Sequence, residues 1–193
     1  MVWVDLVLKK EGLLPRAEQL GCVLYELSTD LSVTTLEEKN RQAAVLDLSG
    51  FALEKVSLSQ TQVLQQLAIR KPRFAYGLEE SQKHDFLHYR RSGMNHIFAQ
   101  AFAKHQIIYL FVLSSLRSAP AVQRAKLLGR WMQNIMLLQK AKARFALVSF
   151  AKQPYELFHK KDGQGLLFLV GAGNTTAKAF LTERDLLFNP KVF

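Results

Sequence analysis

The sequence has little cysteine and no long apolar run, and both absences exclude whole classes of protein. Its 193 residues include one cysteine, Cys22, which cannot form an internal disulfide and indicates a reducing compartment. The longest uninterrupted apolar stretch covers residues 107–113, whereas a membrane-spanning helix needs roughly 20 residues. Periodic structure is expected from the first residues onward, so we predict neither a signal peptide nor a membrane partner.

Catalytic signatures are also missing. The sequence has no Gly-x-Gly-x-x-Gly motif, no phosphate-binding Gly-x-x-x-x-Gly-Lys motif and no His-Glu-x-x-His motif. The glycines of residues 163–165 and 171–173 have the wrong spacing for phosphate loops, and we expect both segments to be ordinary loops. A single cysteine cannot build a zinc–thiolate site. We therefore predict no catalytic residue, no metal ligand and no bound cofactor in this chain.

Carboxylates and histidines leave one enzymatic alternative open. Asp5, Glu26 and Asp47 fall within three successive strand candidates and would converge if those strands formed one barrel mouth. With some of the histidines, they would make a stand-alone metal-dependent phosphoesterase of barrel fold. Helix capping and ion pairing are the competing roles for such residues. The histidines are His84, His88, His96, His105 and His159.

Acidic residues are scarce in the second half of the chain. Residues 1–85 contain 10 basic and 12 acidic side chains, a net charge of −2, whereas residues 86–193 contain 16 basic and 4 acidic, a net of +12. Self-repulsion opposes folding, so a fold does not require this bias, and a polyanionic partner explains it. A peripheral binder of anionic membranes or acidic proteins is the second alternative.

Apolar runs of strand length alternate with helix-like stretches, which is typical of an α/β fold with a parallel sheet. The strand candidates are residues 2–8, 22–27, 43–48, 73–77, 85–89, 107–113 and 145–150. The helix candidates are residues 16–20, 60–69, 92–105, 121–143 and a last helix from Asn174 or Thr175 to before Asn189, while residues 166–170 fit either type. We predict one α/β domain over residues 1–193. A trimmed or irregular parallel barrel and an open doubly wound sheet both fit a length just below about 200 residues.

Basic side chains form clusters in the second half. Arg90 and Arg91 stand before Ser92, which we expect to cap a helix, so that free backbone amides and two arginines would seat a phosphate. A second group would form a stripe on the helix over residues 121–143. Its members are Lys126, Arg130, Gln133, Lys140 and Arg144. His159, Lys160 and Lys161 are expected in a loop.

Short segments over residues 84–162, in a fixed order, resemble the TIM-barrel-like protein subunit of archaeal and eukaryotic ribonuclease P. They are Arg90-Arg-Ser-Gly-Met-Asn-His96, Ser114-Ser-Leu116, Arg124-Ala-Lys-Leu-Leu128, residues 145–151, Pro154-Tyr-Glu-Leu157 and Asp162. The first half agrees only in the order of its elements. Phe158 stands where the family commonly has an arginine, and Gly163, Gly165 and Gly171 loosen the helix that follows.

The resemblance implies a TIM-barrel-like fold that lacks the metal ligands of related hydrolases. Such a subunit supports a catalytic RNA, which uses metal ions to remove the 5′ leader from precursor tRNA. The holoenzyme is then the endoribonuclease, and the isolated chain is not catalytic. The implied partners are the ribonuclease P RNA, the small ferredoxin-like subunit, other subunits and, indirectly, precursor tRNA. The implied location is cytoplasmic in an archaeon and nuclear in a eukaryote.

Contacts to an RNA backbone need lysine and arginine rather than a base-reading code. We centre the predicted RNA contact on the start of the helix near Arg90. The predicted RNA-binding residues are Arg90, Arg91, His96, Lys104, Arg124, Lys126, Arg130, Arg144, Lys160 and Lys161.

Overall fold

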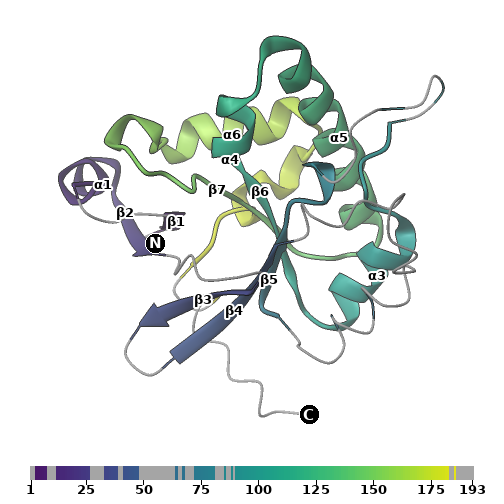
Figure 1. Ribbon diagram of the computed structural model, residues 1–193, viewed down its shortest axis with the longest axis horizontal. Coiled ribbons are helices and arrows are strands. Elements are labelled where there is room, and N and C mark those ends of the chain that lie inside the picture. Colours follow the sequence, from purple (N-terminus) through teal and green to yellow (C-terminus); the bar gives the residue numbers. More distant parts are fainter. Residues whose placement is uncertain are drawn as a thin grey trace.

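Two β-sheets with helices packed against them form the centre of the molecule (Figure 1). The computed structural model describes residues 3–7, 12–26, 33–38, 41–47, 64, 67, 72–80, 85, 88, 90–182 and 185. The smaller sheet pairs β1 (Trp3–Val7) with β2 (Cys22–Glu26) in parallel. The larger sheet has the order β3 (Val33–Glu38), β4 (Arg41–Asp47), β5 (Phe74–Tyr76), β6 (Ile108–Val112) and β7 (Phe145–Val148).

The larger sheet is parallel except at one edge. β4, β5, β6 and β7 run parallel, whereas β3 pairs antiparallel with β4. The predicted strands over residues 107–113 and 145–150 are confirmed, because β6 and β7 consist wholly of buried residues. A strand covered on both faces needs no polar alternation, and this is why a continuous apolar run identified them. β3 was not predicted.

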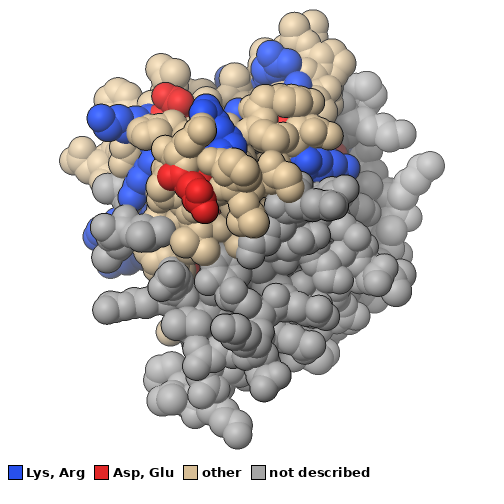
Figure 2. Space-filling view, turned by 90° about the vertical axis from the view of Figure 1, so that its left-hand side faces the viewer, with Lys and Arg blue, Asp and Glu red and all other residues tan. Residues whose placement is uncertain are grey.

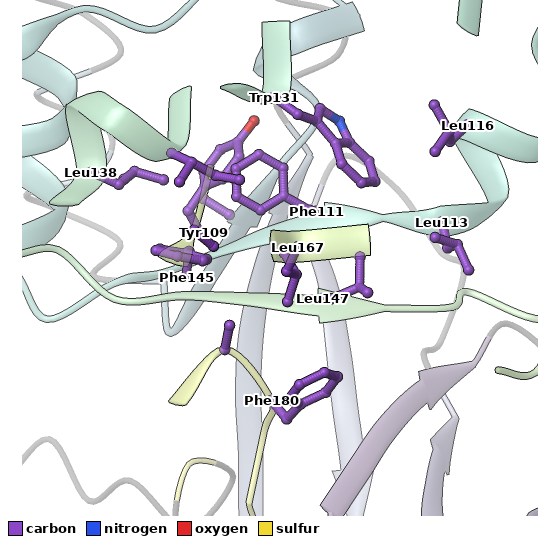
Figure 3. Close-up of a cluster of buried hydrophobic side chains, with 14 of the residues drawn as sticks. Tyr109, Phe111, Leu113, Leu116, Trp131, Leu138, Phe145, Leu147, Leu167 and Phe180 are labelled. Carbon is purple, nitrogen blue, oxygen red and sulfur yellow. The ribbon is translucent and has the colours of Figure 1, made fainter. Parts of the chain in front are cut away.

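Helices pack against the face of β6 that carries Tyr109 and Phe111. Figure 3 shows these two side chains with Trp131 in one cluster, and the Phe111 and Trp131 ring centroids lie 5.1 Å apart. The bounds of all described helices are as follows. The α-helices are α1 (Leu14–Leu20), α3 (His96–Lys104), α4 (Leu113–Ser118), α5 (Ala121–Lys140) and α6 (Lys160–Leu169), and the 3₁₀ helices are η1 (Leu78–Glu80), η2 (Pro154–Glu156) and η3 (Gly173–Lys178). The predicted long helix is confirmed as α5, whose apolar side buries Trp131 against β6.

Several predicted boundaries are corrected. Ser92 is buried and does not cap a helix; α3 begins four residues later, where the Asn95 side chain accepts a hydrogen bond from the Phe98 amide at 2.9 Å. Lys160, Lys161 and the glycines of residues 163–165 lie in α6 rather than in loops, and residues 166–169 are helical too. The segment after Ala172 is the 3₁₀ helix η3.

Other predictions fall largely outside the described residues. These are the helix over residues 60–69, the strand over residues 85–89 and the last helix beyond residue 182. Among the described helices, none is both long and apolar enough to span a membrane.

The parallel α/β class is confirmed, but the predicted barrel is not. The described strands form two separate sheets and no closed barrel. β1 is attached to the end of β7: the Phe150 amide donates to the Leu6 carbonyl at 2.9 Å, and the Ser149 amide donates to Asp5 Oδ1 at 2.8 Å. This attachment brings the carboxyl ends of β1, β6 and β7 to the same edge of the molecule.

Candidate nucleic-acid interface

A pocket of about 420 Å³ lies where β6 and β7 end. In open parallel sheets the crevice beyond the carboxyl ends of the strands is the usual place for a ligand. α4 follows β6 directly, and η2 and α6 follow β7. The lining residues are Arg16, Leu113, Leu116, Arg117, Arg124, Leu157, Phe158, His159, Asp162, Gly163 and Leu166.

Arg124 holds the neighbouring helix in place. Its Nε donates to the Leu116 carbonyl at 3.1 Å, and its Nη2 donates to the Arg117 and Ala119 carbonyls at 3.3 and 3.2 Å. The last carbonyl groups of a helix have no partner inside the helix, so a guanidinium group placed there stabilises the end of α4. The predicted RNA-binding residue Arg124 therefore has a local structural role at the pocket.

Two further arginines on the pocket were missed by the sequence reasoning. Arg117 donates from Nη1 to the Glu156 carbonyl, and Arg16 donates from Nη1 to Gln19 Oε1 at 3.0 Å. Within the part of the chain that the structure describes, neither guanidinium group forms an ion pair with a carboxylate. A signal for Arg117 existed, since it directly follows the Ser114-Ser-Leu116 segment. Arg16 had none, because it stands alone in the nearly neutral half.

The pocket is positively charged and bordered by a helix N-terminus. Its lining contains three arginines and one acidic residue, Asp162. His159 caps α6, and its Nδ1 accepts a hydrogen bond from the Lys161 amide at 3.2 Å. The first backbone amides of a helix and its dipole favour a nearby anion. Figure 2 shows Lys and Arg side chains spread over the described part of the face that carries α1, with acidic side chains between them.

The wall of the pocket is apolar and tightly packed. Phe158 is 5% exposed, and its ring centroid lies 5.1 Å from that of Trp3. A Cβ on Gly163 would lie 2.6 Å from Phe158 Cε2, so the glycine lets α6 approach the ring closely. This packing accounts for the departure from the family pattern at Phe158, because an arginine there would be buried in an aromatic cluster.

Lys160 and Lys161 start α6 beside the pocket. The Lys160 ammonium group lies 5.6 Å from the centre of the Phe180 ring, close enough for a cation–π contact. Lys161 is exposed. Of the predicted RNA-binding residues, the structure thus places Arg124, Lys160 and Lys161 on and around this pocket.

The predicted group around Arg90 lies elsewhere. The Arg90 side chain crosses α5 and donates from Nη1 to the Gly129 carbonyl at 3.3 Å, and a Cβ on Gly129 would lie 2.6 Å from Arg90 Nε. The Arg91 amide donates to Asp85 Oδ1 at 2.9 Å. Since α3 begins only at His96 and Asn95 caps it, the phosphate seat expected at Ser92 is not formed.

His96 and Lys104 are exposed at the two ends of α3, and Lys126 is partly exposed on α5. These three residues keep surface positions away from the lining of the pocket. They form no single cluster with Arg124.

Two predicted residues are used inside the fold. Arg130 is 1% exposed; its Nε and Nη2 contact Asp85 Oδ1 at 2.9 and 2.8 Å, and its Nη1 donates to the Glu79 carbonyl at 2.7 Å. Arg144 lies beyond the end of α5, and its Nη2 donates to Asp185 Oδ2 at 3.1 Å. The expected basic stripe on one helix face is therefore not continuous.

The three strands of the enzymatic alternative do not form one barrel mouth, because β1 and β2 belong to the smaller sheet and β4 to the larger one. Asp5 is fully buried, and burial raises its pKa to about 7 against the opposing hydrogen bonds from Ser149. Among the described residues, no three His, Cys, Asp or Glu side chains are grouped as metal ligands would be. Asp5 instead fastens β1 to the end of β7.

Similarity to known proteins is found among solved structures. No protein-family model and no curated protein matches the sequence. Among solved structures, a chain in a cryo-electron microscopy structure of archaeal ribonuclease P with mature tRNA matches over 91% of this chain and 76% of its own length. The identity is 14% and the TM-score is 0.49.

Proposed function

We propose that this chain is the TIM-barrel-like protein subunit of a ribonuclease P. In this role it binds and stabilises the catalytic RNA that removes the 5′ leader from precursor tRNA. The proposal is supported by the place where the segments that resemble that family meet. Leu116 and Arg124 lie in one stretch of the chain and Leu157 and Asp162 in another, 33 residues further on, and both stretches contribute to one pocket.

Four of these segments each place one residue on the pocket lining. These residues are Leu116, Arg124, Leu157 and Asp162. The resemblance rests on sequence alone, so nothing in it required the segments to be neighbours in space. Their convergence at the carboxyl edge of a parallel sheet is what a shared binding site would produce. The segment that starts at Arg90 does not join them.

The chain contacts RNA through charge rather than through chemistry of its own. We assign the principal contact to Arg124, Lys160 and Lys161 and a secondary one to Arg90, Arg91, His96, Lys104 and Lys126. Arg130 and Arg144 are left out, because their guanidinium groups hold Asp85 and Asp185. Hydrolysis belongs to the RNA and its metal ions, and the small ferredoxin-like subunit is the expected protein partner. The cytoplasm of an archaeon or the nucleus of a eukaryote is the expected location.

Co-purification from native cells tests this function. A tagged full-length chain should enrich the ribonuclease P RNA and the other protein subunits, and the eluate should cleave precursor tRNA at the 5′ leader junction. Absence of that RNA from the eluate would reject the proposal.

The purified chain alone provides the control against the enzymatic alternative. It should not cleave precursor tRNA with Mg²⁺ or Mn²⁺ present, because the described residues contain no group of side chains that could hold a metal ion. Metal-dependent cleavage at the correct junction by protein alone, lost on Asp5→Asn, would favour the stand-alone phosphoesterase instead.

A further inference from the structure

The pocket combines two kinds of surface that one ligand must match. Arg16, Arg117 and Arg124 come from three different helices, and the lining of the pocket contains a single carboxylate, that of Asp162. Beside them is a wall of leucine and phenylalanine side chains. A ligand with an anionic group and a flat apolar body fits both surfaces, and a bare phosphate fits only the first.

We propose that this pocket holds one unstacked nucleotide of single-stranded RNA, with its phosphate between Arg16 and Arg117 and its base on the apolar wall. The inference rests on the proposed function, and it specifies which part of the RNA the pocket takes. It also separates this pocket from the surface around Arg90.

The arginines retain the donors that a phosphate needs. A guanidinium group has five N–H donors and matches the geometry of phosphate oxygens. Arg117 and Arg16 each use one donor in the hydrogen bonds described above, and both acceptors are uncharged oxygens. These bonds orient the two side chains without neutralising them. Arg124 uses Nε and Nη2 for three carbonyl groups, so it holds α4 in place and adds its positive charge to the pocket.

The apolar wall consists of closely packed side chains, and its partly exposed member, Leu166 on α6, offers the surface that a base would contact. Leu116, Leu157 and Phe158 are each at most 7% exposed, and they come from α4 and from the segment after η2. Bases of single-stranded RNA stack on apolar and aromatic side chains, whereas a duplex keeps its bases paired inside and presents mainly backbone. A volume of about 420 Å³ is within the usual range of small-ligand pockets, roughly 300–1,000 Å³. Asp162 adds an acceptor for a ribose hydroxyl or a base amino group.

Binding of a short single-stranded RNA and of its duplex to the full chain tests the proposal. The double variant Arg16→Ala/Arg117→Ala should lose about tenfold in affinity for the single strand, and the log–log salt slope should flatten by about one unit for the lost phosphate contact. Its affinity for the duplex should fall much less. Lys140→Ala removes an exposed charge at the far end of α5 and should behave like the parent with both RNAs.

A separate variant, at Leu166, tests whether the base contacts the apolar wall. Leu166 is partly exposed, so Leu166→Ser should leave the fold intact, as checked by circular dichroism and thermal melting. It should weaken single-strand binding with an unchanged salt slope, because it removes no charge. A flattened slope or an unchanged affinity would overturn the place given to the base.

Three results would overturn the whole inference. They are equal losses with single strand and duplex, unchanged single-strand affinity in the double variant, and binding of free uridine monophosphate without binding of the single strand. The outcome stays separate from that of the proposed function. If the variants bind oligonucleotides as expected but the tagged chain does not enrich ribonuclease P RNA, the proposed function is rejected and the nucleotide pocket stands. If the tagged chain enriches that RNA but the variants bind oligonucleotides like the parent, only the nucleotide pocket is rejected.

Discussion

Arginines lie at both edges of the parallel strands, and the two groups have opposite surroundings. Arg73 and Arg144 directly precede β5 and β7, so they lie at the amino edge, where both contact Asp185. Arg117 follows β6 at the carboxyl edge and pairs with a main-chain carbonyl instead. Asp185 is 4% exposed, so the first group neutralises a buried carboxylate, although the half-exposed Arg144 also lines a second pocket. The guanidinium group of Arg117 has no such carboxylate partner among the described residues and lines the carboxyl-edge pocket.

The contrast shows that residue type alone does not assign an arginine to RNA. A guanidinium group that meets a buried carboxylate fixes the fold, because removing either partner leaves a desolvated charge. A guanidinium group that meets only carbonyl oxygens is held in place and keeps its net charge. Arg144 and Arg117 look alike in the sequence, and their partners far along the chain decide between the two roles.

Buried carboxylates also fall into two groups, those without an arginine partner and those with one, and the pH dependence of stability that follows is the largest expected effect. Burial raises the pKa of Asp5 and the pKa of Glu79 to about 7, and the hydrogen bonds from Ser149 and Tyr109 only partly oppose it. Burial also acts to raise the pKa of Asp185, but hydrogen bonds from Arg144 and Thr182 outweigh it and lower that pKa.

For Asp5 and Glu79 the folded pKa is above the unfolded one, so the folded state binds more protons between about pH 4 and 7. We expect the free energy of unfolding to fall as pH rises through this window, by up to ~1.4 kcal/mol per pH unit for each group. Urea titrations at several pH values measure it. Asp5→Asn and Glu79→Gln should flatten the profile, and Asp162→Asn should not; an unfolding free energy that rises over the window would contradict the assignment.

The second prediction removes the neutralising carboxylate of the amino edge. Asp185→Ala leaves Arg73 and Arg144 without their shared partner and also removes the acceptor of the Thr182 amide. Breaking a buried pair costs about 3–5 kcal/mol, and because Arg144 is half exposed we expect the lower end, about 3 kcal/mol of unfolding free energy. Asp162→Ala at the other edge should cost less than about 1 kcal/mol. If urea denaturation gave the same loss of unfolding free energy for both variants, the amino and carboxyl edges would not differ in the structural role of their carboxylates.

The sequence predicted the parts that depend on local pattern. Continuous apolar runs identified β6 and β7, and the buried stripe around Trp131 identified α5, because burial on both faces or on one helical face leaves a direct trace. The start of α3 was misplaced although Asn95 is as good a cap as Ser92; what decides is that Ser92 is buried while Asn95 reaches the Phe98 amide.

The long-range parts could not be predicted. Arg130 fits an exposed helix stripe by spacing, yet its partner Asp85 lies 45 residues away and takes it into the interior. The pocket joins Arg16 to residues between 113 and 166, about 100 to 150 positions further on, which no local period encodes. The motif resemblance did find several of the segments that meet there, but it gave no reason for them to be neighbours.

The third prediction compares charge reversal at two places on the surface. Arg117→Glu should lower RNA affinity by about tenfold and flatten the salt slope by at least about one unit, since it acts at the proposed phosphate position. Arg90→Glu should lower it less, because the Arg90 guanidinium lies across α5 and outside the pocket lining. Filter binding at several salt concentrations gives both numbers. A larger effect at Arg90 would move the principal contact to α3.

The smallest expected effect is a gain. Asp162→Asn removes the negative charge from the pocket lining and keeps a hydrogen-bond acceptor. Affinity for single-stranded RNA should rise about two- to threefold at low salt, and this gain should shrink at high salt, where exposed charges are screened. A loss of affinity would contradict this prediction, because it would show that the contact to the ribose or base requires the charged carboxylate.

Ultraviolet cross-linking of the full chain to its bound RNA, followed by mass spectrometry of the peptides, tests most directly which edge binds. Cross-links should map to residues 113–124 and 154–166, around the carboxyl edge of the strands. Cross-links concentrated instead at Lys142, Arg144 and Lys178, which line a second pocket at the amino edge, would contradict the account.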